Sequence, residues 1–323
     1  MRVLLAVDGS AGSQQAARLV QALAWPPETT LTLLGVVDPG AWIPPGPGVP
    51  GRGGLVRENE VSAYLAGHQL AISAELGRAG LVAEPTIVRG RPADSIVDEA
   101  RRIDADLVVL GSRGHGRIGA LLLGSVSAAV VDRAPSSVLV ARGRGITSVV
   151  LAIDGSRSAR AAARIAATWS AFAAVPIAVA TVAEAIRPWT SGISPAFITR
   201  ARRTHAHLVR NASSEAIQIA EEAVAGLLKA GRTATAHVRR GDVAAEIIAI
   251  AKELDADLVV MGCRGRTSLR TFLLGSIARD VVLASDASVM VVRAGRGGKG
   301  RPGRKPGPAH LPPNRSKRRH SRI

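Results

Sequence analysis

The sequence contains few aromatic residues and a single cysteine. Phenylalanine, tryptophan and tyrosine together make up 2% of the 323 residues, so Ala, Val, Leu and Ile must build the cores. Cys263 has no second cysteine to pair with, which excludes an intrachain disulfide and a cysteine cluster for zinc. A chain without disulfides suits a reducing compartment, so we expect the protein in the cytoplasm.

Long hydrophobic segments are also missing. The apolar run at residues 3–7 ends at Asp8, far short of the hydrophobic region of a secretory signal. Residues 165–183 are uncharged, but they are rich in Ala, contain Pro176 and align with an ordinary helix, loop and strand in the first part of the chain. We therefore expect neither export nor a membrane span.

Acidic residues are absent from the last part of the chain, so more than half of the net positive charge lies there. Of the formal net charge of +17, ten charges lie in residues 295–323, which leaves +7 for the rest. This segment is rich in Gly, Pro and basic residues, so we predict a basic, disordered tail. Such a tail could attract nucleic acid electrostatically, and a solubilising tail without a specific partner is the simpler interpretation.

Several catalytic motifs are absent as well. The chain has no G-x4-G-K-[ST] loop, and so it lacks the lysine that such a loop directs at the β and γ phosphates. Neither a G-x-S-x-G turn around a nucleophilic serine nor an H-E-x-x-H metal pair occurs. Fast hydrolysis would therefore be hard to explain, and we predict no catalytic residues and no metal-ligating residues.

What the chain does contain is one sequence unit in two copies. RVLLAVDGS at residues 2–10 returns as SVVLAIDGS at residues 148–156, an offset of 146. DADLVVLGSRG at residues 104–114 returns as DADLVVMGCRG at residues 255–265, an offset of 151, so the second copy holds five extra residues. A repeat of this length predicts two similar domains in tandem.

Short apolar runs alternate with helical spacing in each copy. In the first copy, five runs typical of buried parallel strands lie at residues 3–7, 31–37, 85–88, 107–110 and 138–140. Helical spacing lies between them, at residues 13–23, 58–76, 92–102 and 125–132. We predict an α/β fold of two tandem Rossmann-like domains, each a five-stranded parallel sheet with helices on both faces. The predicted boundaries are 1–143, 146–294 and, for the tail, 295–323.

Each copy carries a glycine-framed loop after its fourth strand. The loops share the pattern G-x2-G-x9-G-S, formed by Gly111, Gly114, Gly124 and Ser125 and, in the second copy, by Gly262, Gly265, Gly275 and Ser276. Glycines let backbone N–H groups approach an anion, and a helix N-terminus adds unpaired N–H groups and a favourable dipole. One such loop often serves only a turn or a helix cap. Because the pattern occurs twice, we interpret it as phosphate-binding.

Asp8 and Asp154 each follow the first strand of their copy, within the sequence DGS. They should lie at the carboxyl ends of the strands, where sheets of this kind bind ligands. A carboxylate there can accept hydrogen bonds from ribose hydroxyls or hold a metal ion. It also suits a cap or turn residue ahead of the first helix, and the two roles are compatible.

Both copies resemble the UspA domain of the universal stress protein family, whose adenine-nucleotide-binding motif is G-x2-G-x9-G-S. The resemblance covers residues 2–142 and 148–293 and identifies the chain as similar to tandem members. It implies that the two aspartates face the ribose and that the glycines and serines of the loops hold the phosphates. It further implies backbone contacts from the next residues, Val126 and Ile277, and an adenine beside Val36 and Val182.

The function that this resemblance implies is binding of ATP, or a related adenine nucleotide, in a cytoplasmic stress response. We interpret the protein as a regulatory module in which the nucleotide, with or without Mg²⁺, shifts a conformation or a partner surface. Two alternatives stay open. A slow Mg-dependent ATPase or nucleotidyl-transfer enzyme would use Asp8 or Asp154, and a nucleic-acid-binding protein would use the tail.

The resemblance also implies an arrangement of the two copies. Separate subunits of the family pair through their last strands, so residues 138–141 and 289–292 should pair and make one chain mimic a dimer. A homodimer of the whole chain is compatible with this. The segments after the second strands differ: residues 38–54 should form an irregular loop or lid rich in Pro and Gly, unlike residues 184–200. We therefore expect two sites of unequal affinity.

Overall fold

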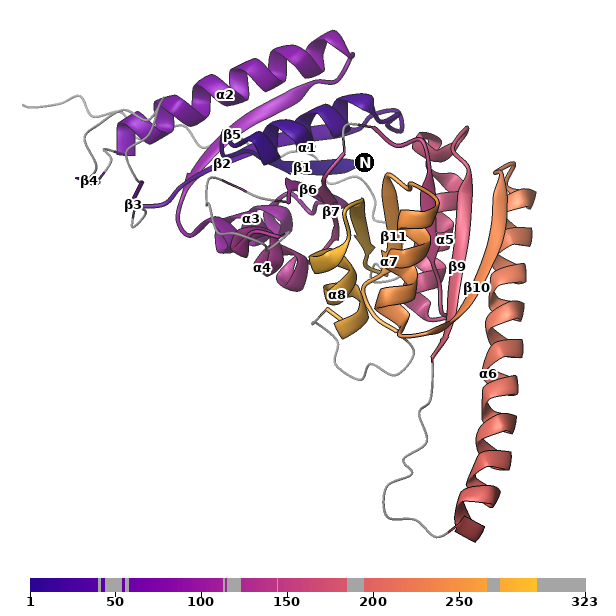
Figure 1. The fold of residues 1–323 in the computed structure, drawn as a ribbon. Coiled ribbons are helices and arrows are strands. Elements are labelled where there is room, and N and C mark those ends of the chain that lie inside the picture. Colours follow the sequence, from indigo (N-terminus) through magenta and orange to yellow (C-terminus); the bar gives the residue numbers. More distant parts are fainter. Residues whose placement is uncertain are drawn as a thin grey trace, which may run out of the picture.

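A computed structural model of the chain (Figure 1) describes residues 1–39, 42–43, 54–55, 58–112, 114, 123–143, 145–184, 195–265 and 274–294. Side chains are described over the same residues except at 42–43, 54–55 and 195–210. The predicted tail at 295–323 lies outside the described residues, as does most of the segment at 38–54.

Strands and helices alternate in the predicted order in both halves, which we define as residues 1–143 and 145–294. The first half consists of β1 (Arg2–Ala6), α1 (Ala11–Ala22), β2 (Thr30–Val37), β3 (Trp42–Ile43), β4 (Gly54–Leu55), α2 (Glu58–Arg78), β5 (Ala83–Arg89), α3 (Pro92–Arg102), β6 (Leu107–Gly111), α4 (Ser125–Arg133) and β7 (Ser137–Ala141). The second half consists of β8 (Val149–Ala152), α5 (Arg157–Thr168), the 3-10 helix η1 (Ser170–Phe172), β9 (Ile177–Glu184), α6 (Pro195–Lys229), β10 (Ala234–Gly241), α7 (Val243–Glu253), β11 (Leu258–Gly262), α8 (Ser276–Ala284) and β12 (Ser288–Val292).

Ten of these strands form one sheet, in the order β10-β9-β8-β11-β12-β7-β6-β1-β2-β5. Within each half, neighbouring strands are parallel, which confirms the predicted α/β fold of two tandem domains. The strands β7 and β12 pair antiparallel, with Val138 opposite Val291 and Val140 opposite Val289. This strand pair is called the seam below. It joins the two five-stranded sheets into a continuous one.

Helices cover both faces of the sheet. The helices α1, α2, α5 and α6 pack on one face, and α3, α4, α7 and α8 pack on the other (Figure 1). Successive strand residues point to opposite faces, so that Leu4 belongs to the core under α3 and α4 and Leu5 to the core under α1 and α2. Both cores consist mainly of Ala, Val, Leu and Ile, as the shortage of aromatic residues requires.

An aromatic cluster provides a second contact between the halves. Trp25, which follows α1, lies with its ring centroid 5.2 Å from that of Trp169, which follows α5. Trp169 also packs edge-on against Phe172, and its Nε1–H donates to the Ala24 carbonyl at 3.0 Å. Trp169 is only 6% exposed, so this cluster adds buried apolar area to the strand pairing of the seam.

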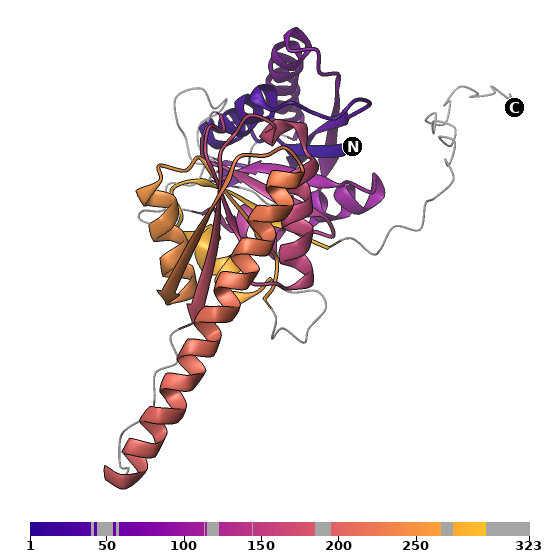
Figure 2. The ribbon, with the colours of Figure 1, turned by 90° about the vertical axis from the view of Figure 1, so that its right-hand side faces the viewer.

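The halves differ most after their second strands. In the first half, β3 and β4 pair as a short antiparallel ribbon within a segment that the sequence predicts to be irregular. Trp42 and Ile43 are residue types that favour strands, which accounts for this difference. In the second half, α6 has 35 residues against 21 in α2, and Figure 2 shows its first turns projecting past β9 and β10.

Residues 165–183 form parts of α5, η1 and β9, as predicted for an ordinary helix, loop and strand. Across the described ranges, no helix is long and apolar enough to cross a membrane.

Candidate functional site

The strand order changes direction between β1 and β6 in the first half and between β8 and β11 in the second. From β1 the chain moves outward to β2 and β5 and then returns to β6 on the other side of β1. Such a switch point opens a crevice at the carboxyl ends of the two strands, where α/β sheets bind ligands. Asp8 and Gly111 lie there in the first half, and Asp154 and Gly262 in the second.

The two oxygens of the Asp8 side chain have different surroundings. The Ser10 N–H donates to Asp8 Oδ1 at 2.9 Å and closes the turn between β1 and α1. A Cβ atom on Gly114 would lie 2.6 Å from Asp8 Oδ2, so any larger residue at this position would push the Asp8 carboxylate aside. Oδ1 of Asp8 therefore accepts the hydrogen bond of the turn, and Oδ2 lies beside Gly114 of the glycine loop.

The second half repeats this geometry. The Ser156 N–H donates to Asp154 Oδ1 at 3.0 Å, and a Cβ atom on Gly265 would lie 3.1 Å from Asp154 Oδ2. In both halves, the structure brings the predicted aspartate together with the second glycine of the predicted loop.

The first glycine of each loop is fixed by packing against a neighbouring helix. A Cβ atom on Gly111 would lie 2.5 Å from the carbonyl oxygen of Gly12, in the first turn of α1. A Cβ atom on Gly262 would lie 2.5 Å from Ser158 Oγ and 2.7 Å from the Ala159 nitrogen, in α5. Close approach of strand and helix thus explains why these two positions are glycine, while their predicted phosphate contact stays a prediction.

Among the residues that the structure describes, none caps the helices that begin at the glycine loops with its side chain, because both N-cap residues are glycines. α4 begins at Ser125 after Gly124, and α8 begins at Ser276 after Gly275, whereas α1 is capped by the side chain of Ser10. The first N–H groups of a helix lack intrahelical partners, so the starts of α4 and α8 present amide donors and the positive end of a dipole. Both serines are exposed. An anion could therefore accept hydrogen bonds at either helix start.

Hydrogen bonds connect the start of each helix to the end of the strand that precedes its loop. The Gly124 N–H donates to the Ser112 carbonyl at 2.7 Å, and Ser127 Oγ donates to the Gly111 carbonyl at 2.8 Å. In the second half, the Gly275 N–H donates to the Cys263 carbonyl at 2.9 Å. The glycines of each predicted motif are therefore neighbours in space, although nine residues separate the second from the third in the sequence.

The hydrophobic positions implied by the resemblance lie on the face covered by α3, α4, α7 and α8. Val126 and Ile277, which follow the two serines, are partly buried there, as are Val36 on β2 and Val182 on β9. The strands β2 and β9 neighbour β1 and β8. Val36 and Val182 are therefore placed one strand away from the aspartates, at the same end of the sheet.

Two aromatic side chains of α2 cover the Asp8 turn. Gly9 has a φ of +79°, and a Cβ atom on it would lie 2.6 Å from Tyr64 Cε1 and 2.8 Å from His68 Cδ2. The two rings meet edge-on, with centroids 4.4 Å apart. Burial raises the pKa of Tyr64, and the negative charge of Asp8 raises that pKa further. The Tyr64 phenol therefore lies close enough to Asp8, the residue predicted to face the ribose, for the charge of Asp8 to affect its pKa.

This aromatic pair was not predicted from the sequence. Tyr64 is the single tyrosine of the chain, and at an offset of 151 the second copy has Glu215 in its place. His68 corresponds to Ile219, whose Cδ1 would lie 3.2 Å from a Cβ atom on Gly155. The two sites thus differ beside their aspartates as well as in the segments after their second strands.

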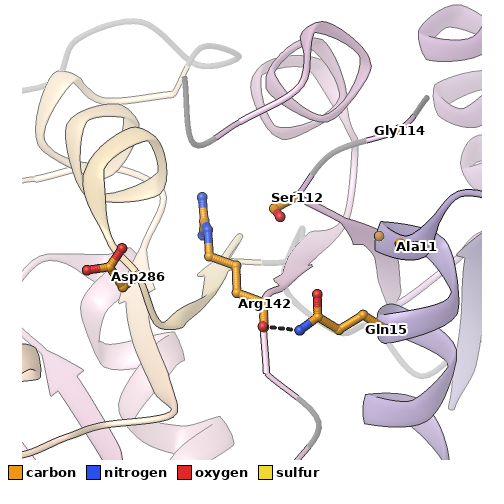
Figure 3. Close-up of a pocket in the computed structure, with 7 residues that line it drawn as sticks. Ala11, Gln15, Ser112, Gly114, Arg142 and Asp286 are labelled. Atoms are coloured by element: carbon orange, nitrogen blue, oxygen red, sulfur yellow. Dashed lines mark hydrogen bonds between the residues drawn. The ribbon is translucent and has the colours of Figure 1, made fainter. Parts of the chain in front are cut away.

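A pocket of about 420 Å³ lies beside the first glycine loop (Figure 3). It is lined by residues of α1, of the loop and of the segments next to the seam, namely Ala11, Gly12, Gln15, Ser112, Gly114, Arg142 and Asp286. Figure 3 shows the Arg142 side chain between Ser112 and Asp286, and the Gln15 amide donates to the Arg142 carbonyl. Because Asp286 precedes β12, the second half contributes to the surface around the first loop.

Within the part of the chain that the structure describes, no group of three or more His, Cys, Asp or Glu side chains could hold a metal ion. Cys263, which replaces Ser112 in the second loop, is 7% exposed. Its N–H donates to the Val292 carbonyl at 2.9 Å, so it packs as a small buried residue beside β12.

Comparisons with known proteins agree with this architecture. The family model described as "Universal stress protein family" matches residues 1–142 and 145–293. A universal stress protein of Mycolicibacterium smegmatis is 28% identical over 306 residues, which cover 90% of this chain and 96% of that protein. One from Thermus aquaticus is 34% identical over 142 residues, 43% of this chain and 97% of that protein. The crystal structure of one from Archaeoglobus fulgidus has a TM-score of 0.59 at 19% identity, and the match covers 91% of this chain and 98% of that chain.

Proposed function

The chain belongs to the universal stress protein family, and on this premise we propose that it binds an adenine nucleotide in each half, with ATP as the first ligand to test. The bound nucleotide would shift a conformation or a partner surface in a cytoplasmic stress response. Mg²⁺ would arrive with the phosphates of ATP, and Asp8 or Asp154 could supply a carboxylate ligand to it.

The observation that carries this proposal is an uncapped helix start beside a carboxylate oxygen that faces the same loop. In the first half, the phosphates would accept hydrogen bonds from the first amides of α4 and from the Ser125 hydroxyl. Asp8 Oδ2 lies beside Gly114, and in the proposed complex it would accept a hydrogen bond from a ribose hydroxyl. Donors for phosphate and an acceptor for sugar thus lie at one crevice, and the second half repeats them with Ser276 and Asp154.

Binding without rapid turnover fits the residues at this crevice. Enzymes that transfer phosphoryl groups quickly use positioned cations and a group that orients the nucleophile. The sequence has no P-loop lysine, and the helix starts offer backbone amides and a serine hydroxyl. The site would therefore hold a nucleotide long enough for its bound state to act as a signal.

The antiparallel pairing of β7 and β12 supports a further part of the proposal, namely that one chain takes the place of a dimer. The two crevices would then correspond to the sites of two separate subunits. A homodimer of the whole chain would bring four such sites together, and its presence is measured by light scattering of the purified protein.

The proposal is tested by placing a negative charge at each helix start. Ser125→Asp and Ser276→Asp should repel phosphate, whereas a carboxylate in the first helical turn stabilises a helix by about 0.3–1 kcal/mol. Both serines are exposed, so neither change disturbs a core. We expect isothermal titration with ATP to show heat for two sites of unequal affinity, with Ser125→Asp and Ser276→Asp each removing one.

Ser125→Ala and Ser276→Ala are the matched controls, since they remove the hydroxyl without adding charge and should weaken binding less than the aspartates do. Heat of ATP binding that persists in the doubly substituted Asp protein would refute the proposed sites. The enzymatic alternative is tested by phosphate release from ATP in the presence of Mg²⁺. Steady release that Asp8→Ala and Asp154→Ala abolish would support it instead.

A further inference from the structure

Two arginines cross the seam and occupy equivalent positions. Arg142 follows β7 and Arg293 follows β12, and they are 151 residues apart, which is the offset of the repeat. The Arg142 N–H donates to Ser288 Oγ at 3.0 Å, and the Arg293 N–H donates to Ser137 Oγ at 3.3 Å. Each backbone is therefore tied to the first residue of the last strand in the opposite half.

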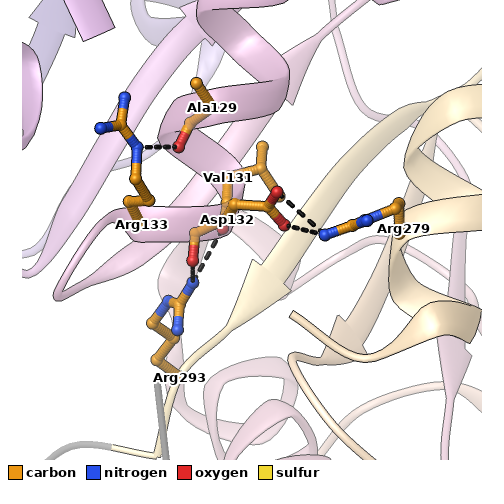
Figure 4. Close-up of polar contacts among 6 residues, drawn as sticks. All are labelled: Ala129, Val131, Asp132, Arg133, Arg279 and Arg293. Carbon is orange, nitrogen blue, oxygen red and sulfur yellow. Dashed lines mark hydrogen bonds and ion pairs between the residues drawn. The ribbon is translucent and has the colours of Figure 1, made fainter. Parts of the chain in front are cut away.

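The two guanidinium groups reach the ends of helices in the opposite half. Arg142 Nη2 donates to the Val282 carbonyl of α8 at 2.5 Å, and Arg293 Nη2 donates to the Val131 carbonyl of α4 at 2.8 Å. Figure 4 shows that Arg293 also donates to the Asp132 carbonyl, at 2.9 Å. Val131 and Val282 are again 151 residues apart, so the contact is made twice in the same way.

These carbonyls belong to the last turns of the two helices whose first turns carry the proposed phosphate sites. The last carbonyls of a helix lack intrahelical partners, and a cation there is favoured by the helix dipole. α4 and α8 each have nine residues, or about 14 Å of length at the usual rise of an α-helix. In an element this short, a displacement of one end is passed on to the other, so contacts at the last turn constrain where the first turn lies.

The first half receives an additional contact that the second half lacks. Arg279 on α8 donates from Nη2 to both carboxylate oxygens of Asp132 on α4, at 2.9 Å each (Figure 4). In the repeat, Arg279 corresponds to Ala128 and Asp132 corresponds to Leu283, and this second pair of residues cannot form an ion pair. Two arginines of the second half therefore hold the end of α4.

Arg293 also lies close to the glycine loop of its own half. Burial lowers the pKa of its guanidinium, the neighbouring Cys263 and Asp132 raise that pKa, and Arg264 lowers it. Arginine keeps its charge at neutral pH, so the contact with α4 is a charge-assisted one. The side chain thus lies between the loop of the second half and the helix of the first.

We propose that Arg293 and Arg142 are positioning residues for the nucleotide site of the opposite half: Arg293 sets the start of α4 for the first site, and Arg142 sets the start of α8 for the second. This inference rests on the proposed function, because the affinity that it concerns is that for a nucleotide. Each site would then depend on contacts made across the seam.

The test uses full-length proteins that keep one site. Ser276→Asp should leave only the first site and Ser125→Asp only the second, and titration with ATP establishes this before any arginine is changed. If the single-site proteins bind no ATP, the proposed function is refuted, and the proposed role of the arginines is refuted with it. If they bind, Arg293→Met is added to the protein that keeps the first site.

We expect Arg293→Met to raise the dissociation constant of the first site about fivefold or more, within the usual range for coupling between sites. Arg142→Met should do the same to the second site in the Ser125→Asp protein. Arg293→Lys should give an intermediate loss, because lysine keeps the charge and can donate hydrogen bonds, but its ammonium sits on a flexible stem and lacks the fixed planar geometry of the guanidinium group. This variant also serves as the test if Arg293→Met fails to fold.

Arg133→Met is the matched control. Arg133 is a basic residue at the same end of α4, but it pairs with Asp94 and with the Ala129 carbonyl inside its own half. Removing it should leave the affinity of the first site unchanged, because the contacts across the seam remain. An unchanged affinity in Arg293→Met, or an equal loss in Arg133→Met, would overturn the proposal.

Discussion

Replacing Gly111 with alanine should destabilise the protein, whereas replacing Gly67 with alanine should stabilise it. Gly111 ends β6, and its added Cβ atom would lie 2.5 Å from the Gly12 carbonyl oxygen and 2.9 Å from the Gly12 Cα atom. Ordinary contacts of a Cβ atom begin near 3.4 Å, so β6 and α1 would have to move apart.

The neighbouring elements cannot easily make this room. Both colliding atoms belong to the backbone, β6 is buried along its whole length, and the start of α1 is fixed by the Ser10 cap. Overpacking of this kind costs about 1–3 kcal/mol. At about 2–4 °C per kcal/mol for a domain of this size, the melting temperature should fall by roughly 2–12 °C.

Gly67 provides the matched control. It lies inside α2, and a Cβ atom on it would meet nothing within 4 Å. Alanine inside a helix is favoured over glycine by about 0.5–1 kcal/mol, so Gly67→Ala should raise the melting temperature. Thermal unfolding followed by circular dichroism measures both variants. If Gly111→Ala unfolds at or above the wild-type temperature, the close contact between β6 and α1 is not what requires glycine there.

Three further results are expected. Titration of phenolate absorbance should place the pKa of Tyr64, the single tyrosine, above 10.0, and Asp8→Asn should lower it; an unchanged value would exclude the contribution of Asp8. Trp169→Ala should cost about 3–5 kcal/mol in denaturant unfolding, because this side chain is buried at the contact between the halves, and a cost below 1 kcal/mol would contradict that. Asp132→Asn should cost at most about 1 kcal/mol, because its ion pair with Arg279 is partly exposed.

Much of the fold could be predicted because the chain repeats itself. Strands buried on both faces are continuous apolar runs, so β6 was expected at residues 107–110 and is found at Leu107–Gly111. The copy at an offset of 151 then identified β11. The ribbon of β3 and β4 was not predicted, since two-residue strands are too short to show a period.

The candidate site was predictable where a particular residue type marks a position and not where any residue could serve. Asp8 and Gly114 were expected at one crevice, and the structure brings them together. The contacts of Arg142 and Arg293 could not be read from the sequence, because any residue supplies a carbonyl acceptor and only the fold decides which one is near. Likewise, the role of Gly111 depends on its distance from Gly12 in the folded chain.

The central claim is that the two crevices bind one nucleotide each, and native mass spectrometry counts bound nucleotides directly. With ATP and Mg²⁺ present, the account predicts two ATP molecules on the wild-type chain, one on Ser125→Asp, one on Ser276→Asp and none on the double variant. A wild-type chain that binds no ATP, or a double variant that still binds two, would contradict it.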